Sequence, residues 1–338
     1  MLTQTNHRET YRFVPSTSTP VSPERVAELL KAEWELFTKQ TGKSAEESKR
    51  SFKSLPLGVT SSFQHWDPYP ISIVSAKGAW MTDVDGRQLL DLSMGFGAML
   101  AGHLNPVIVE EVKKALETGT LFVTPSPIST DAAERICRRF GIDQVRFTNS
   151  GTESTMYAVR TARAATDKNA IVKIEGGYHG SYDPFVVSSK PPIDKIGDEN
   201  DPIAHVPEGI VPGEIYVVPY NNADALERTF KKHGSSIACF ILEPVLENLG
   251  IVLPDEGYLE RVRELCDEYN VVLIFDEVKT GLTAGHQGAA QRLGVTPDLI
   301  TLAKSIGGGL TLAAFGGKKK YMDFVTNGKM AHFGTFNG

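Results

Sequence analysis

The chain has few cysteines, no excess of positive charge and no long apolar run. Its three cysteines, Cys137, Cys239 and Cys266, lie far apart and form no CxxC pair, so we expect free thiols in a reducing compartment and no metal ion. The net charge of −6 argues against nucleic-acid binding, which requires a basic surface. No run approaches the roughly 20 apolar residues of a membrane span, and the N-terminus lacks a secretory core. We therefore expect a cytoplasmic protein that does not bind membranes.

The N-terminal part of the sequence predicts two helices. Residues 1–20 are polar and rich in threonine and proline, and we expect them to be mobile. A helix is predicted to begin at Ser22-Pro23, because serine caps helices and proline fits their first turn. Ser44 and Glu47 have the spacing of a capping box, which predicts the start of a second helix.

From about residue 105, helical patterns alternate with short apolar runs. The predicted helices cover 106–117, 128–140, 153–165, 223–233 and 256–269. The apolar runs read QVRFT, AIVKIE, IACFILE, VVLIF and DLITLA. Several are apolar on both faces, as in buried strands of a parallel sheet. This alternation predicts an α/β fold with a mainly parallel central sheet flanked by helices. In such folds the active site lies beyond the carboxyl ends of the strands.

Two other segments have a distinct pattern. VDG at 84–86 stands between alternating segments and predicts a hairpin turn. Residues 188–216 are rich in proline, glycine and aspartate and predict a long loop.

The residues that follow the first two predicted strands suit a phosphate and an aromatic ring. NSGTES follows QVRFT and would begin a helix. The backbone N–H groups at that helix start, with the Ser150 and Thr152 hydroxyls, would bind phosphate. The alternative is an ordinary capped helix, which has the same pattern. GGYHG follows AIVKIE, and its glycines would present Tyr178; a tight turn with a surface aromatic is the alternative.

Acidic and basic residues follow the later strands. Glu243 precedes a proline and also fits a structural turn, whereas Asp276 fits either a helix cap or a catalytic group. Lys304 stands between an apolar run and three glycines. Burial there would lower its pKa and make the amine a better nucleophile. The alternative is a lysine that reaches solvent from the end of a strand. A phosphate site, an aromatic face, a carboxylate and a lysine are together what pyridoxal phosphate requires.

At these residues the chain resembles the class III aminotransferases of pyridoxal-phosphate fold type I. It is especially similar to the branch of glutamate-1-semialdehyde aminomutases, D-phenylglycine aminotransferases and β-amino-acid aminotransferases. The matching motifs, from about residue 50 onward, are DVDG, GHLNP, FTNSGTE, EGGYHG, EPV, FDEVKTG, LAKSIGGG and GTFNG. The resemblance implies a large pyridoxal-phosphate-binding domain at 81–338, preceded at 1–80 by a helical segment of a small domain.

The resemblance also implies a role for each matching residue. Lys304 would form the Schiff base with the cofactor and carry protons between the amino carbon and the cofactor. Asp276 would hold the proton on the pyridine nitrogen. His179 would shape its turn rather than act as a catalytic base. The phosphate would be bound by Ser150, Gly151 and Thr152.

Further roles concern the ring and the subunit interface. Tyr178 would stack on one face of the cofactor ring, and Val278 would pack against the other. Thr335 would reach the phosphate in a neighbouring subunit, so the active site would be shared within a homodimer. Glu243 and Glu153 belong to motifs near the cofactor.

Two departures from the family pattern concern the substrate and the length. Relatives have an arginine for the substrate carboxylate at or near the position of Gln64, and an amide replaces a guanidinium poorly. Gln64 and Glu243 are the candidate substrate-binding residues, and a substrate without a free carboxylate, such as an aldehyde, a ketone or a carrier-bound thioester, fits Gln64. The chain stops at Gly338, within the GTFNG motif. We expect a fragment that lacks the C-terminal small domain, is weakly active and aggregates readily.

The resulting prediction is an aminotransferase that moves an amino group from a donor to a carbonyl acceptor through Lys304. The alternative is glutamate-1-semialdehyde 2,1-aminomutase, in which the amino group moves within one substrate. A non-catalytic protein that keeps the fold, and a nucleotide-binding oxidoreductase suggested by GFGAML at 95–100, are less consistent with this set of residues.

Overall fold

A computed structural model describes residues 21–198, 200 and 204–337. The chain divides into two compact units, one of residues 1–76 and 80–90 and one of residues 77–79 and 91–338. The predicted domain boundary at residue 80 remains a prediction, and the predicted mobility of residues 1–20 lies outside the described residues. No helix within the described ranges is long and apolar enough to cross a membrane.

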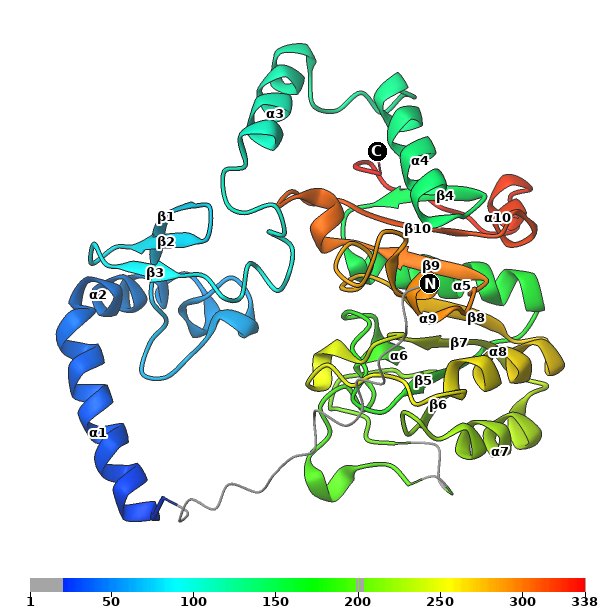
Figure 1. Ribbon diagram of the computed structural model, residues 1–338, viewed down its shortest axis with the longest axis horizontal. Helices are drawn as coiled ribbons and strands as arrows, with labels where there is room; N and C mark the ends of the chain where they lie inside the picture. Colours follow the sequence, from blue (N-terminus) through cyan, green and yellow to red (C-terminus); the bar gives the residue numbers. More distant parts are fainter. Residues whose placement is uncertain (1–20, 199, 201–203, 338) are drawn as a thin grey trace, which may run out of the picture. The chain divides into compact units, whose positions relative to one another are not determined.

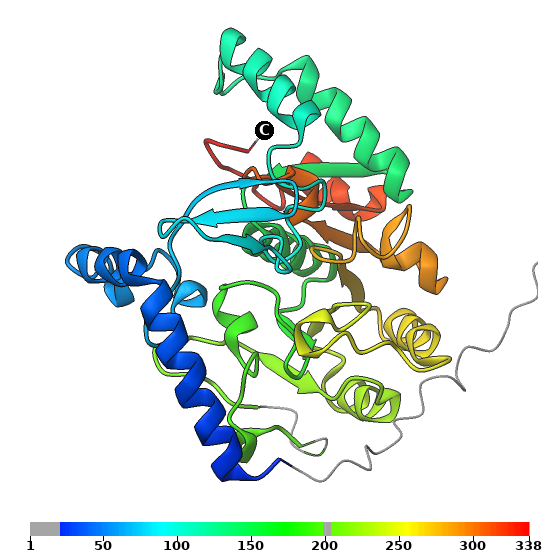
Figure 2. The same ribbon diagram turned by 60° about the vertical axis from the view of Figure 1, so that its left-hand side comes forward.

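The first unit consists of two helices and a small antiparallel sheet. Helix α1 (Pro23–Gln40) begins as predicted, with the Ser22 hydroxyl accepting from the Arg25 backbone N–H at 3.2 Å. Figure 2 shows it in dark blue as one long helix. The sheet has the order β1 (Ile73–Lys77), β2 (Trp80–Asp83), β3 (Gln88–Leu90), and the predicted turn at 84–86 joins β2 to β3.

The predicted capping box is wrong. Helix α2 (Gly42–Ser51) begins before Ser44, with Thr41 at its N-cap. The Ser44 hydroxyl donates instead to Asp85 at 2.7 Å, and Glu47 pairs with Arg50. The Ser44 hydroxyl therefore hydrogen-bonds to a residue 41 positions away in the sequence, and not to the helix backbone as the local spacing predicted.

The second unit contains a seven-stranded sheet in the order β4-β10-β9-β8-β7-β5-β6 (Figure 1). Its strands are β4 (Gln144–Thr148), β5 (Ala170–Ile174), β6 (Ile215–Val218), β7 (Ile237–Leu242), β8 (Val272–Asp276), β9 (Leu299–Leu302) and β10 (Ala313–Gly317). The pairs among β6, β5, β7, β8 and β9 are parallel, and β10 is antiparallel to both neighbours. This confirms the predicted α/β fold with a mainly parallel sheet.

Helices cover both faces of this sheet and bury it. The longer helices of the second unit are α3 (Pro106–Thr118), α4 (Pro127–Phe140), α5 (Gly151–Thr166), α7 (Ala223–His233), α8 (Tyr258–Glu268) and α10 (Lys319–Thr326). One core cluster joins the sheet to α7 and α8 through side chains such as Phe230 and Leu265. The other joins it to α5 and α10 through side chains such as Val159 and Met322. Strands buried on both faces explain the continuous apolar runs in the sequence.

Strands β6 and β10, helix α10 and the short helices α6 (Asp183–Val186) and α9 (Gly288–Leu293) were not predicted. Strand β10 ends in Gly316 and Gly317, a composition that reads as loop. Here the glycines are required, because a Cβ on either one would lie 2.2–2.3 Å from a backbone oxygen of a neighbouring segment. The predicted loop at 188–216 is irregular in its described part, apart from η4 (Ile193–Lys195), and its last two residues begin β6.

Candidate active site

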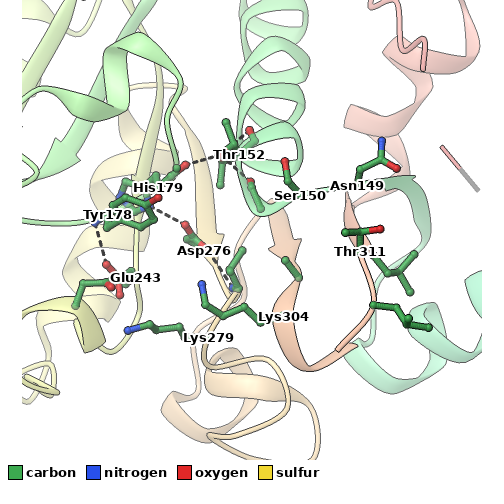
Figure 3. Close-up of a pocket in the computed structure, with 18 residues that line it drawn as sticks. Asn149, Ser150, Thr152, Tyr178, His179, Glu243, Asp276, Lys279, Lys304 and Thr311 are labelled. Atoms are coloured by element: carbon green, nitrogen blue, oxygen red, sulfur yellow. Dashed lines mark hydrogen bonds and ion pairs between the residues drawn. The ribbon is translucent and has the colours of Figure 1, made fainter. Parts of the chain in front are cut away.

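A pocket of about 200 Å³ lies beyond the carboxyl ends of the parallel strands, entirely within the second unit (Figure 3). It brings together most of the residues predicted from the strand ends. Those that line it are Ser150, Gly151, Thr152, Tyr178, Glu243, Asp276, Val278 and Lys304. Residues separated by up to about 150 positions thus meet in one place, as the parallel topology predicts.

The N-terminus of α5 lines the pocket at the position where the sequence predicts a phosphate site. Ser150 is the N-cap, and its hydroxyl accepts from the Glu153 N–H at 3.2 Å. Glu153 in turn accepts from the backbone N–H of Asn149 at 2.8 Å, which fixes the turn before the helix. The loop that contains Gly180 packs closely against the start of α5, because a Cβ on Gly180 would lie 2.4 Å from the Thr152 hydroxyl oxygen. Free N–H groups at the start of a helix favour an anion at this position.

Asp276 ends β8 and is buried, with a relative exposure of 4%. Its carboxylate accepts from His179 Nδ1 at 2.8 Å, from the Val278 N–H at 3.0 Å and from the Thr301 hydroxyl at 3.2 Å. Thr301 stands opposite Asp276 in the β8–β9 register. Three donors from three segments therefore fix this carboxylate in one orientation.

His179 has a larger structural role than its sequence position suggests. Its ring is buried, and Nε2 has no hydrogen-bond partner among the described residues, whereas Nδ1 meets Asp276. Because a carboxylate only accepts, Nδ1 is the donor in this contact. His179 thus helps to position Asp276, and the expectation that it does not act as a catalytic base remains a prediction.

Lys304 follows β9 as the first residue of η6 (Lys304–Gly307), with a left-handed φ of 51°. Its amine forms no hydrogen bond or ion pair with the described residues, and the side chain is half-buried. Burial lowers the pKa of this lysine; Asp276 opposes that shift, and the nearby Lys279 adds to it. A lowered pKa increases the fraction of neutral amine, which is the nucleophilic form.

Glu243 joins two loops at the pocket wall. One carboxylate oxygen accepts from the Tyr178 N–H at 3.1 Å, and the other from the Glu247 N–H at 3.2 Å. Figure 3 shows Tyr178 beside His179 and above Asp276. Glu243 therefore fixes the backbone that carries the aromatic ring.

Two predicted site residues do not line this pocket. Gln64 belongs to the first unit, is exposed and accepts from the Thr60 hydroxyl at 2.7 Å. Thr335 is exposed in the irregular segment after α10. The proposed contacts of Gln64 with a substrate and of Thr335 with a neighbouring subunit remain predictions.

Several lining residues had no predicted role, among them Asn149, Asn248, Lys279 and Thr311. Lys279 is the one charged residue in this group. Its position three residues after Asp276, at the end of a buried strand, is the sequence signal that would have identified it.

The arrangement fits pyridoxal phosphate. The helix N-terminus suits the phosphate, the fixed carboxylate suits a basic ring nitrogen, and the unpartnered amine suits an aldehyde.

Comparison with known proteins supports the same assignment. Residues 62–338 match the family model of class-III aminotransferases, and the chain belongs to that family. It is 42% identical over 286 residues to the glutamate-1-semialdehyde 2,1-aminomutase of Methanocorpusculum labreanum, covering 84% of this chain and 68% of that protein. It is 40% identical over 272 residues to the enzyme of the same name from Ignicoccus hospitalis, covering 80% and 64%. The chain thus spans about two-thirds of the length of these relatives.

Solved structures extend this likeness to the fold. An omega-transaminase from Sphaerobacter thermophilus is 36% identical with a TM-score of 0.84, covering 87% of this chain and 69% of that one. A transaminase with pyridoxal phosphate bound is 34% identical with a TM-score of 0.81, covering 88% and 70%. A glutamate-1-semialdehyde aminomutase from Pseudomonas aeruginosa is 26% identical with a TM-score of 0.85, covering 95% and 72%. The predicted fold and the predicted cofactor, pyridoxal phosphate, are confirmed by the family and these structures.

Proposed function

We propose that the protein catalyses amino-group transfer with pyridoxal phosphate, using Lys304 as the reactive amine and Asp276 as the partner of the ring nitrogen. The observation that supports this most directly is the pairing, in one pocket, of an amine without a partner and a buried carboxylate held by three donors. When bound, the cofactor supplies an aldehyde that condenses with amines and a protonated ring that withdraws electrons.

The residues of the chain would bind the cofactor, orient it and transfer protons. Ser150, Thr152 and the N-terminus of α5 would bind the phosphate. Asp276, oriented by His179, would hold a proton on the ring nitrogen. Tyr178 and Val278 would flank the ring. Lys304, with its lowered pKa, would accept and return a proton at the substrate carbon that bears the amine.

The more specific reaction that we propose is that of glutamate-1-semialdehyde 2,1-aminomutase. The curated relatives described above carry this name at 40–42% identity, which favours it over the two-substrate aminotransferase that the sequence motifs suggested first. The two-substrate reaction remains the second candidate, because Gln64 stands where an arginine was expected and the omega-transaminase is 36% identical.

We further propose that the partners are small molecules and a second copy of the chain, with Thr335 reaching the neighbouring site. A partner's threonine at the phosphate would explain why Thr335 lies exposed and away from its own pocket.

One assay separates the two reactions. The holoenzyme would be charged with pyridoxamine phosphate and given glutamate-1-semialdehyde alone, and 5-aminolevulinate would be measured over many turnovers. Catalytic formation without a second carbonyl compound would support the aminomutase. No product, together with conversion of the cofactor to its aldehyde form by a keto acid or an aldehyde, would support the two-substrate aminotransferase.

A further inference from the structure

Lys279 brings a second side-chain ammonium group to the pocket. It follows β8 three residues after Asp276, whereas Lys304 follows β9, the parallel neighbour of β8. Both lysines line the pocket, because adjacent parallel strands end at the same edge of the sheet. In Figure 3, Lys279 extends on the side of Glu243, whereas Ser150 lies on the other side of Lys304. Lys279 is thus separated from the end that suits the cofactor phosphate.

The ammonium group of Lys279 has no hydrogen bond or ion pair with any described residue, although the side chain is half-buried. The carboxylates that line the pocket are occupied. Asp276 accepts from three donors, and Glu243 accepts from two backbone N–H groups. Neither can turn toward Lys279 without leaving a buried donor unpaired, which is costly.

Glu247 is the one nearby acid that is not engaged in this way. Its side chain receives no hydrogen bond from the described residues, and no ion pair within 4.0 Å joins it to Lys279. Burial raises the pKa of Glu247, while the charge of Lys279 opposes that shift. Glu247 is therefore the only competitor for this ammonium group that the described residues provide near the pocket.

A partly desolvated cation without a counter-ion favours an anionic ligand, because a charge-assisted hydrogen bond replaces lost hydration. We propose that Lys279 is a specificity-determining residue that binds the carboxylate of the substrate. This inference rests on the proposed amino-group transfer at Lys304 and identifies its substrates as amino or carbonyl compounds that carry a carboxylate. It also supplies the carboxylate contact that Gln64 was expected to lack.

The test compares a carboxylate ligand with its uncharged methyl ester. 4-Oxopentanoate and its methyl ester would be titrated into the holoenzyme in its aldehyde form, and the dissociation constants measured by calorimetry. The variants are Lys279→Met, Lys279→Arg and Glu247→Gln, with Lys232→Met as the control, since Lys232 is exposed on α7 and lies outside the pocket. Because no amine is transferred, the result does not depend on turnover.

Lys279→Met should weaken binding of 4-oxopentanoate by about tenfold or more and leave the ester unchanged, as expected for the loss of a hydrogen bond to a charged group. Lys279→Arg should retain most of the affinity for the acid. Glu247→Gln should strengthen it, because the competing negative charge is removed. Lys232→Met should have no effect.

Equal affinity of wild type and Lys279→Met for the acid would overturn the proposal. An equal loss of affinity for the acid and the ester in Lys279→Met would also overturn it. A lower affinity for pyridoxal phosphate with unchanged binding of 4-oxopentanoate would also overturn it, since Lys279 would then serve the cofactor. A different result would contradict the proposed function alone: the holoenzyme transfers no amine to or from any substrate, but the charge-dependent binding persists.

Discussion

Two lysines of the second unit show how the same side chain serves different purposes. Lys173 lies in the middle of β5 with no exposed surface, and Lys304 lies just beyond the end of β9 in the pocket. Burial lowers the pKa of both, that of Lys173 to about 7. Their partners differ, because Lys173 donates to the Val187 carbonyl at 2.7 Å, the Phe185 carbonyl at 3.3 Å and the Ser189 hydroxyl at 3.5 Å.

A lowered pKa therefore does not by itself make a lysine reactive. The three N–H groups of the Lys173 ammonium each have an acceptor, so the side chain ties the 185–189 segment to β5. Lys304 has no such partner among the described residues and faces space that a ligand can enter. What distinguishes the two is a nitrogen that remains available for chemistry.

The two regions are also connected through His179. The Phe185 ring packs edge-on against the His179 ring with centroids 5.6 Å apart, and His179 contacts Asp276. Lys173 thus supports, through the segment it holds, the histidine that contacts the Asp276 carboxylate. Substitutions at four residues test this comparison, from the largest expected effect to the smallest.

Lys304→Ala should reduce turnover by at least about a thousandfold, as expected when the reactive group itself is removed. Its effect on stability should be small, because the amine has no partner to lose among the described residues. Turnover and urea denaturation would be measured on the same preparation. Substantial turnover in Lys304→Ala would show that the reactive amine lies elsewhere.

His179→Leu should reduce turnover by about a hundredfold, because Asp276 would lose one of its three donors and move from its productive position. His179→Gln, whose amide can donate to the carboxylate, should recover part of the loss. The absorption spectrum of the bound cofactor should shift with His179→Leu and return toward wild type with His179→Gln. Equal loss in both variants would indicate that His179 only fills space.

Lys173→Met should change how stability depends on pH. The folded-state pKa of about 7 lies below the usual value of 10.5, so the unfolded chain binds more protons between these values. The free energy of unfolding of the wild type should therefore rise with pH from about 7 toward 10.5, relative to Lys173→Met, which lacks this titration. Urea denaturation at pH 7 and pH 9 measures the difference. The same difference at both pH values would contradict the lowered pKa of Lys173.

Ser189→Ala should have the smallest effect. It removes the longest of the three hydrogen bonds to Lys173 and the hydrogen bond that the Ser189 hydroxyl donates to the Phe185 carbonyl, and it leaves both carbonyl acceptors of Lys173 in place. The free energy of unfolding should fall by about 1–2 kcal/mol, with turnover nearly unchanged. A loss as large as that of Lys173→Met would mean that the hydroxyl, rather than the two carbonyls, holds the ammonium group.

Local sequence patterns were sufficient to predict β4, the parallel strands other than β6, and the residues at their ends. The runs that predicted β4, β5, β7, β8 and β9 agree with the structure to within about a residue. For the last four, the reason is that strands buried on both faces need continuous apolar sequence. Asp276 and Lys304 stood out because a charged residue is unusual beside such a run. The topology then brought them together.

Contacts between distant residues were not predictable in this way. Nothing near His179 in the sequence indicates that it meets Asp276, 97 positions later. Lys173 lies inside an apolar run, and its acceptors are backbone carbonyls of a segment whose path the sequence does not specify. Strand β10 was missed because its glycines are needed for close packing against neighbouring backbone, which resembles loop composition.

The position of β10 in the sheet also has a consequence for synthesis of the chain. Strand β4 pairs only with β10 in the described sheet, and about 165 residues separate Thr148 from Ala313. At about 5–20 residues per second, a ribosome needs roughly 8–33 s to make that stretch. Throughout that time the nascent β4 has no strand to pair with, and the turn at Ser150 that follows it has no finished sheet to hold it. The turn at Ser150 is thus synthesised early and completed late, so a chaperone that shields this segment would act during that interval.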